Sequence, residues 1–109
     1  MRTLRFTVNK QNIQPDPNCD FNGLVPGTDG YLQASFLFSS EWDGCTKVVA
    51  FRSRTGKEFP PQLLEDGKTC MIPTEALERR MFSVQVIGKK KGFRIITNKT
   101  VVSQNGGKR

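Results

Sequence analysis

The chain has 109 residues and a formal net charge of +7, because 17 lysine and arginine side chains face only ten aspartates and glutamates. Hydrophobic residues make up 36% and charged residues 25% of the sequence, a balance that excludes a wholly disordered chain and suits one domain with its own core. No segment approaches the ~18 consecutive apolar residues of a membrane-spanning helix, so we expect no membrane partner.

The N-terminal segment starts directly with an apolar–polar alternation between Leu4 and Val8, which predicts a strand and lacks the apolar run of a signal peptide. The chain contains Cys19, Cys45 and Cys70 but no C-x-x-C pair and no histidine. An odd number of cysteines argues against a disulfide framework. We therefore expect free thiols in a protein that folds in a reducing cytoplasm.

The same alternation recurs along the chain and is typical of half-buried strands. It covers residues 31–38, 47–52, 82–88, 92–97 and 99–104. Large apolar residues occupy the positions that this pattern turns inward. We expect the core to contain Phe36, Phe38, Trp42, Phe51 and Phe82.

Turn signals separate these strands. Residues 15–30 are rich in proline and glycine and have no periodicity, so they predict a loop. Asp43-Gly44 predicts a tight turn, and only residues 73–80 suggest a short helical turn. Many short strands joined by polar turns predict an all-β fold, an antiparallel β-sandwich, with this one helical turn near residues 73–80. Alternation alone leaves the strand order open, and with it the choice between a sandwich and a barrel.

Catalytic chemistry has few candidate residues in this sequence. Histidine, the commonest general base and a frequent metal ligand, is absent. The carboxylate pairs Glu41/Asp43 and Glu65/Asp66 fall in predicted turns, where acidic side chains usually accept hydrogen bonds from backbone amides. We expect no enzymatic activity, no cofactor and no metal ion.

Trp42 is the only tryptophan and precedes the Asp43-Gly44 turn. One interpretation is that its indole folds over the end of the sandwich and caps the face formed by Phe36 and Phe38. The alternative is an exposed tryptophan that anchors a protein interface. We favour the first interpretation and keep Trp42 as a candidate interaction residue.

Basic residues gather in one predicted hairpin, where Lys89, Lys90 and Lys91 form the only run of three and Phe93 and Arg94 follow. A basic β-barrel could use such a hairpin to bind single-stranded nucleic acid or to inhibit a host enzyme of nucleic-acid metabolism. Lysines at a hairpin tip also prevent strands from pairing edge to edge with a neighbour. Lys89, Lys90, Lys91 and Arg94 are therefore the remaining candidate interaction residues.

The order of several motifs resembles a family of tailed-bacteriophage domains. These motifs are Glu41–Gly44 before Lys47, Asp66-Gly67 before Cys70 and Ile72-Pro73, Gly88, and the closing segment Arg94–Asn98. The family consists of small immunoglobulin-like β-sandwich domains that occur alone or at the N-terminus of baseplate and tail-fibre proteins of phages infecting Gram-positive bacteria.

The resemblance implies a non-enzymatic virion structural or assembly module, such as a tail, baseplate or capsid accessory protein. We expect it to act through contacts with other virion proteins and with copies of itself, and to reside in the virion after folding in the host cytoplasm. A single domain over residues 1–103 with a flexible tail at residues 104–109 completes the expectation. The expected assembly surface includes the Asn18–Gly30 loop and this tail.

Overall fold

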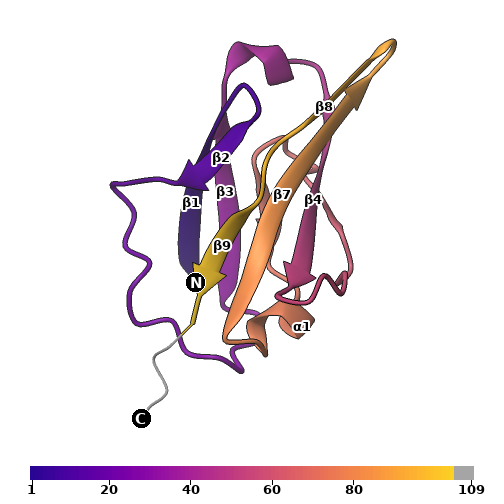
Figure 1. Ribbon diagram of the computed structural model, residues 1–109. Coiled ribbons are helices and arrows are strands. Elements are labelled where there is room, and N and C mark those ends of the chain that lie inside the picture. The colour runs from indigo at the N-terminus through magenta and orange to yellow at the C-terminus, as the bar shows by residue number, and fades with distance from the viewer. Residues whose placement is uncertain (105–109) are drawn as a thin grey trace.

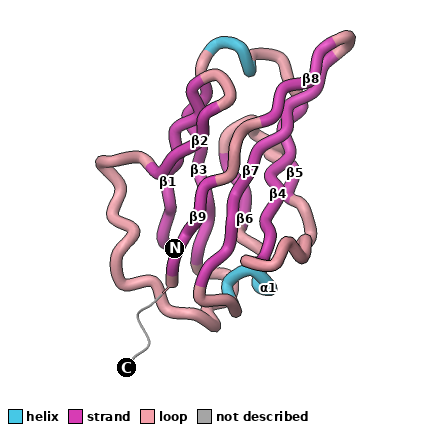
Figure 2. The backbone as a smooth tube through the Cα atoms, in the orientation of Figure 1, coloured by secondary structure: helices cyan, strands magenta, loops and turns pink. Residues whose placement is uncertain are grey.

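The computed structural model describes residues 1–104 and contains two β-sheets packed face to face (Figures 1 and 2). Sheet A has the strand order β2-β1-β3-β6, with the bounds β1 Arg2–Asn9, β2 Asn12–Pro15, β3 Leu32–Phe38 and β6 Thr69–Met71. Sheet B has the order β5-β4-β7-β8, and β9 also pairs with β7; the bounds are β4 Thr46–Ser53, β5 Gln62–Leu63, β7 Met81–Lys90, β8 Phe93–Ile96 and β9 Thr100–Ser103. The predicted all-β sandwich is confirmed.

Two short helical elements close the ends of the sandwich (Figure 1). The 3-10 helix η1 (Ser40–Trp42) lies between β3 and β4, and the single α-helical turn α1 (Thr74–Leu77) lies between β6 and β7. The second of these confirms the helical turn that residues 73–80 predict. Neither helix in residues 1–104 is long and apolar enough to cross a membrane.

One strand pair departs from the expected antiparallel arrangement. β1 and β3 run parallel, with Leu4 opposite Ala34 and Phe6 opposite Phe36. A parallel pair needs a long connection that brings the chain back to the same end of the sheet. The predicted loop over residues 15–30 is most of that connection, and Figure 1 shows it running down the outside of sheet A.

The core lies between the sheets and contains the side chains that the alternation turns inward. Phe36, Trp42, Phe51 and Phe82 are all buried, as predicted. Phe38 is only partly buried, and its side chain packs against the buried core residues. The Phe6, Phe36 and Phe38 rings of sheet A stack in series, and the Trp42 ring of η1 lies tilted against Phe38 with their centroids 5.1 Å apart.

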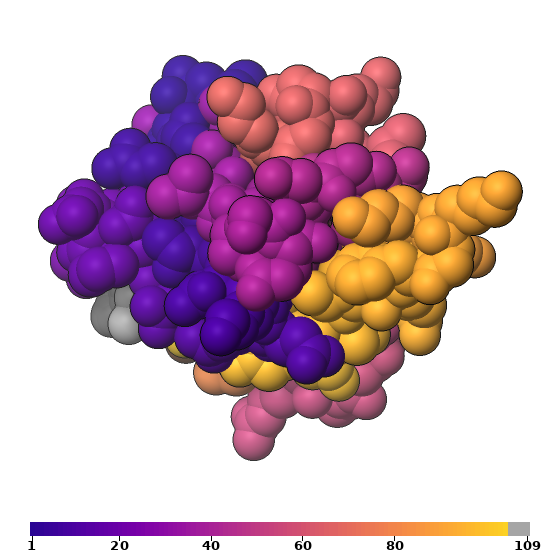
Figure 3. Space-filling view, turned by 90° about the horizontal axis from the view of Figure 1, so that it is seen from above, coloured from indigo at the N-terminus to yellow at the C-terminus, as the bar shows by residue number. Residues whose placement is uncertain are grey.

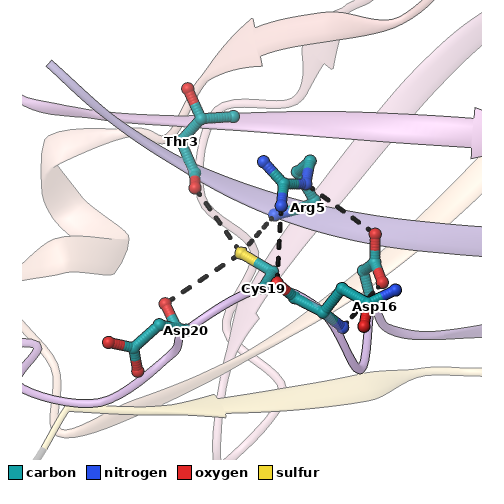
Figure 4. Close-up of polar contacts among 6 residues, drawn as sticks. Thr3, Arg5, Asp16, Cys19 and Asp20 are labelled. Atoms are coloured by element: carbon teal, nitrogen blue, oxygen red, sulfur yellow. Dashed lines mark hydrogen bonds and ion pairs between the residues drawn. The ribbon is translucent and has the colours of Figure 1, made fainter.

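The loop after β2 is fastened to the outer edge of β1 (Figure 4). The Asp16 amide donates to the Arg5 carbonyl at 2.9 Å. Farther along, the Arg5 amide donates to the Cys19 sulfur at 3.3 Å, and the Cys19 thiol donates to the Thr3 carbonyl at 3.7 Å. A side-chain thiol therefore satisfies backbone groups of β1 that a neighbouring strand would otherwise pair with.

All three cysteines are free thiols, as expected. Cys70 is the most affected by its surroundings, because burial and the nearby Asp66 carboxylate raise the pKa of its thiol to about 12. It remains a neutral thiol at physiological pH and packs against the core.

The packed domain reaches at least Gln104, the residue at which we expected a flexible tail to begin. Gln104 is fully buried. Its side-chain amide donates to the Leu77 and Arg79 carbonyls at 3.0 and 2.8 Å, and its backbone amide donates to the Arg80 carbonyl. The rest of the expected tail, residues 105–109, lies outside the described residues.

Candidate interaction surface

Trp42 is part of the core and not of the surface. Its side chain is 0% exposed, and its indole nitrogen donates to the Lys10 carbonyl at 2.8 Å. On the side of sheet B the ring packs directly against Gly88 of β7. The interpretation of Trp42 as a cap on the end of the sandwich is thus confirmed, and the residue is not available as an exposed interface anchor.

The other predicted site residues lie together on the β7–β8 hairpin, which projects beyond the body of the molecule (Figures 1 and 3). Lys89 and Arg94 are opposite one another in the strand register. Lys90 turns the other way: its ammonium donates to the Asp43 carbonyl at 3.0 Å and lies 4.9 Å from the centre of the Phe93 ring. Lys91 occupies the turn and is exposed. The hairpin therefore presents four cations, one of them held by the neighbouring loop.

The outer face of sheet B carries an apolar row that runs across the strands. The register places Leu63 of β5, Val48 of β4, Ile87 of β7 and Ile96 of β8 side by side. Val48, Ile87 and Ile96 are half-buried, and Leu63 is 51% exposed. The alternation within each strand turns these residues away from the core, and both η1 and α1 lie at the ends of the sandwich instead of over this face (Figure 2).

The strands carry cations but no anions. All ten acidic residues lie outside the nine strands of residues 1–104. Strand cations on the outer face of sheet B are Arg52, Lys89 and Arg94. The apolar row therefore lies between the Lys89/Arg94 pair on one side and Arg52 on the other, and the Glu58 carboxylate lies 4.0 Å from the Arg52 guanidinium.

A second group of cations, which the sequence reading missed, meets at the lower end of this face. Arg52, Arg54 and Lys99 line a hollow of about 250 Å³ over the ends of β4, β7 and β9. An adjoining hollow of about 310 Å³ is lined by Arg54, Arg79 and Arg80. Arg79 and Arg80 are adjacent in the sequence, whereas Arg52 and Arg54 come from the end of β4 and Lys99 comes from the connection between β8 and β9.

Two of the four candidate catalytic carboxylates, Asp66 and Glu41, form hydrogen bonds within their turns. Asp66 accepts hydrogen bonds from the backbone amides of Lys68 and Thr69 at 2.9 and 2.7 Å, and the Thr69 hydroxyl donates to its second oxygen. These bonds, with the Thr69 hydroxyl as the largest contribution, lower the pKa of Asp66 to about 2. A hydrogen bond with Ser39 is the main cause that lowers the pKa of Glu41. Among residues 1–104, no three His, Cys, Asp or Glu side chains lie close enough together to hold a metal ion.

Comparisons with known proteins identify no relative. No protein-family model matches the chain, and no curated protein and no solved structure matches it either.

Proposed function

We propose that this protein is a non-enzymatic assembly module of a bacteriophage virion that acts through protein–protein contacts. The observation that carries the proposal is the outer face of sheet B, where a partly exposed apolar row lies between the Lys89/Arg94 pair and Arg52. The resemblance of Glu41–Gly44, the segment around Cys70 and the closing strand to phage β-sandwich domains supports the virion as its setting. Its partners are other virion proteins and copies of itself, which it joins after folding in the host cytoplasm.

The arrangement of this face matches the anatomy of protein interfaces. Such interfaces have an apolar centre that is excluded from water and a polar rim that sets specificity and association rate. Leu63 and Val101 are 51% and 56% exposed, so each has apolar surface to bury against a partner at roughly 25 cal/mol per Å². The immunoglobulin-like architecture of the resembling phage domains suits the same use, because a rigid sandwich presents a preformed face.

Purified particles from cells that encode this chain provide the direct test. We expect mass spectrometry to detect the protein in intact particles, in a constant ratio to the other structural proteins, after a high-salt wash. Leu63→Glu should prevent incorporation, because it puts a charge in the apolar row. Leu37→Glu is the matched control: Leu37 is 72% exposed on the opposite sheet, so the substitution should be tolerated. Finding the protein only in the soluble fraction would contradict the proposal.

A second candidate function is binding of single-stranded nucleic acid by the β7–β8 hairpin. The observation that favours it is Phe93, which is 38% exposed and lies beside the Lys90 ammonium, since exposed aromatic rings among cations can stack on bases. Size-exclusion chromatography with light scattering, with and without a short DNA strand, tests it. Binding at low salt that is lost at high salt and in a variant with Lys89, Lys90 and Lys91 all changed to glutamate would support it. Equal DNA retention by the variant and the wild type would exclude the hairpin as the binding site.

A further inference from the structure

The two adjoining hollows at the lower end of sheet B form a single basin, which we define by its cations Arg52, Arg54, Arg79, Arg80 and Lys99. The hollows share Ser53, Arg54 and Met81, and none of their lining residues is acidic. Three separate segments supply the cations: the end of β4, the chain between α1 and β7, and the connection from β8 to β9. Because like charges so close together repel, the basin gains from any anion that enters it.

Few of these charges are neutralised within the chain. In residues 1–104 the only acidic partner of the five is Glu58, whose carboxylate lies 4.0 Å from the Arg52 guanidinium and whose side chain is 69% exposed. Arg52 also donates to the Gln85 side chain at 2.7 Å, which holds its guanidinium over the sheet. Arg52 thus already has an exposed carboxylate beside it, at the limit of ion-pair distance, and an incoming carboxylate could replace that carboxylate.

The lining favours a polypeptide over a nucleic acid. The one aromatic residue that lines the basin is Phe82, which is 1% exposed and faces the core. A base that entered would therefore find no exposed ring on which to stack, and a single strand would lose the stacking contribution to its binding. Met81 and Val101 instead offer apolar surface, 37% and 56% exposed, beside four guanidinium groups that can grip carboxylates with paired hydrogen bonds.

We infer that the basin binds an acidic segment of a partner protein, with glutamate or aspartate side chains on its arginines and small apolar side chains on Met81 and Val101. The inference rests on the proposed assembly function and specifies the chemistry of the partner. It also assigns a role to the four arginines of the basin. They lie at the opposite end of sheet B from the β7–β8 hairpin, where the sequence predicts the candidate interaction residues.

Fluorescence anisotropy with purified protein tests the inference directly. The probe is a short fluorescein-labelled peptide of alternating glutamate and alanine, and a peptide with glutamine at each glutamate position is its control. The basin variant carries Arg54→Glu and Lys99→Glu, two exposed residues without an ion pair in residues 1–104. The matched variant carries Lys89→Glu and Lys91→Glu on the hairpin and changes the net charge equally.

We expect the basin variant to bind the glutamate peptide about tenfold more weakly than the wild type, and the hairpin variant to bind within about twofold of it, because exposed ion pairs contribute little singly and more as a group. Equal losses in both variants would show that only net charge matters and would overturn the inference. Absence of wild-type binding, or displacement of the peptide by a short DNA duplex that binds more tightly, would also overturn it. Particle incorporation is measured separately, so failure here leaves the assembly function standing.

Discussion

The indole of Trp42 lies directly on the backbone of Gly88. A Cβ atom at Gly88 would come within 2.7 Å of two atoms of the six-membered ring, Cε3 and Cζ3. Gly88 has no positive φ angle, so the close approach of the ring, and not backbone conformation, explains why glycine stands there. This contact joins the end of sheet A to the base of the β7–β8 hairpin.

Gly88→Ala should therefore destabilise the fold by about 1–3 kcal/mol through overpacking, measured by urea unfolding. A double-mutant cycle with Trp42→Phe provides the control, because phenylalanine is a smaller ring and relieves the clash. In that background the cost of Gly88→Ala should fall by about 1 kcal/mol or more. If Gly88→Ala lowers the free energy of unfolding equally in both backgrounds, the Trp42 ring is not the cause of the destabilisation.

Cys19→Ala should loosen the loop that runs along β1. The substitution removes the sulfur that accepts from the Arg5 amide and donates to the Thr3 carbonyl, and we expect a loss of about 0.5–1.5 kcal/mol. Hydrogen exchange at the Arg5 amide should accelerate. Cys19→Ser should retain part of the protection because a hydroxyl has the same hydrogen-bonding capacity. Unchanged exchange at Arg5 in the alanine variant would show that the thiol does not protect this edge.

Asp66 should make stability depend on pH in the acidic range. Its pKa is lowered from 3.8 to about 2 in the folded state, so the unfolded chain binds the proton more readily. The stabilisation is then present above pH 3.8 and is lost as the pH falls towards about 2. Asp66→Asn removes the titration. The difference in urea midpoint between wild type and variant should become smaller as the pH falls from 3.8 towards about 2. A difference that stays constant over this range would show that Asp66 does not cause the pH dependence.

Gln104→Ala should destabilise the end of the sandwich near α1. It removes the amide that donates to the Leu77 and Arg79 carbonyls, and leaving such groups without partners costs about 1–3 kcal/mol. Because Arg79 and Arg80 line the basin, peptide affinity should also decrease. Ser103→Ala, at the exposed preceding residue, should leave both unfolding and peptide binding unchanged. Equal stability of the two variants would contradict the structural role of Gln104.

Much of the architecture follows from local pattern. The alternation of Leu4, Phe6 and Val8 predicts a strand with one buried face, and all three residues are buried. Asp43-Gly44 predicts a turn, and Gly44 has the positive φ angle of 78° that such a turn needs. The central loop and the short helix at residues 74–77 are predictable for the same reason: proline, glycine and chain length restrict the backbone wherever the rest of the protein lies.

The candidate site is harder to predict because it depends on contacts between distant segments. The run Lys89–Lys91 is evident in the sequence, and it predicts a candidate interaction site on the β7–β8 hairpin. Arg54 and Lys99 lie 45 positions apart in the sequence and belong to no common motif. They line one hollow only because β4 and β9 flank β7. The parallel pairing of β1 with β3 and the role of Cys19 at the β1 edge were likewise invisible in the sequence.

The sequence by itself determined the class of fold, the faces of the strands, the buried aromatic core and the excess of positive charge. These properties depend on side-chain period and composition, which each segment carries independently of its neighbours. Only the tertiary structure decided which strands pair, that Trp42 packs on Gly88, and that five scattered cations share one basin. Strand order and register are not written in any one segment, because they result from how the apolar faces of all the strands are buried together.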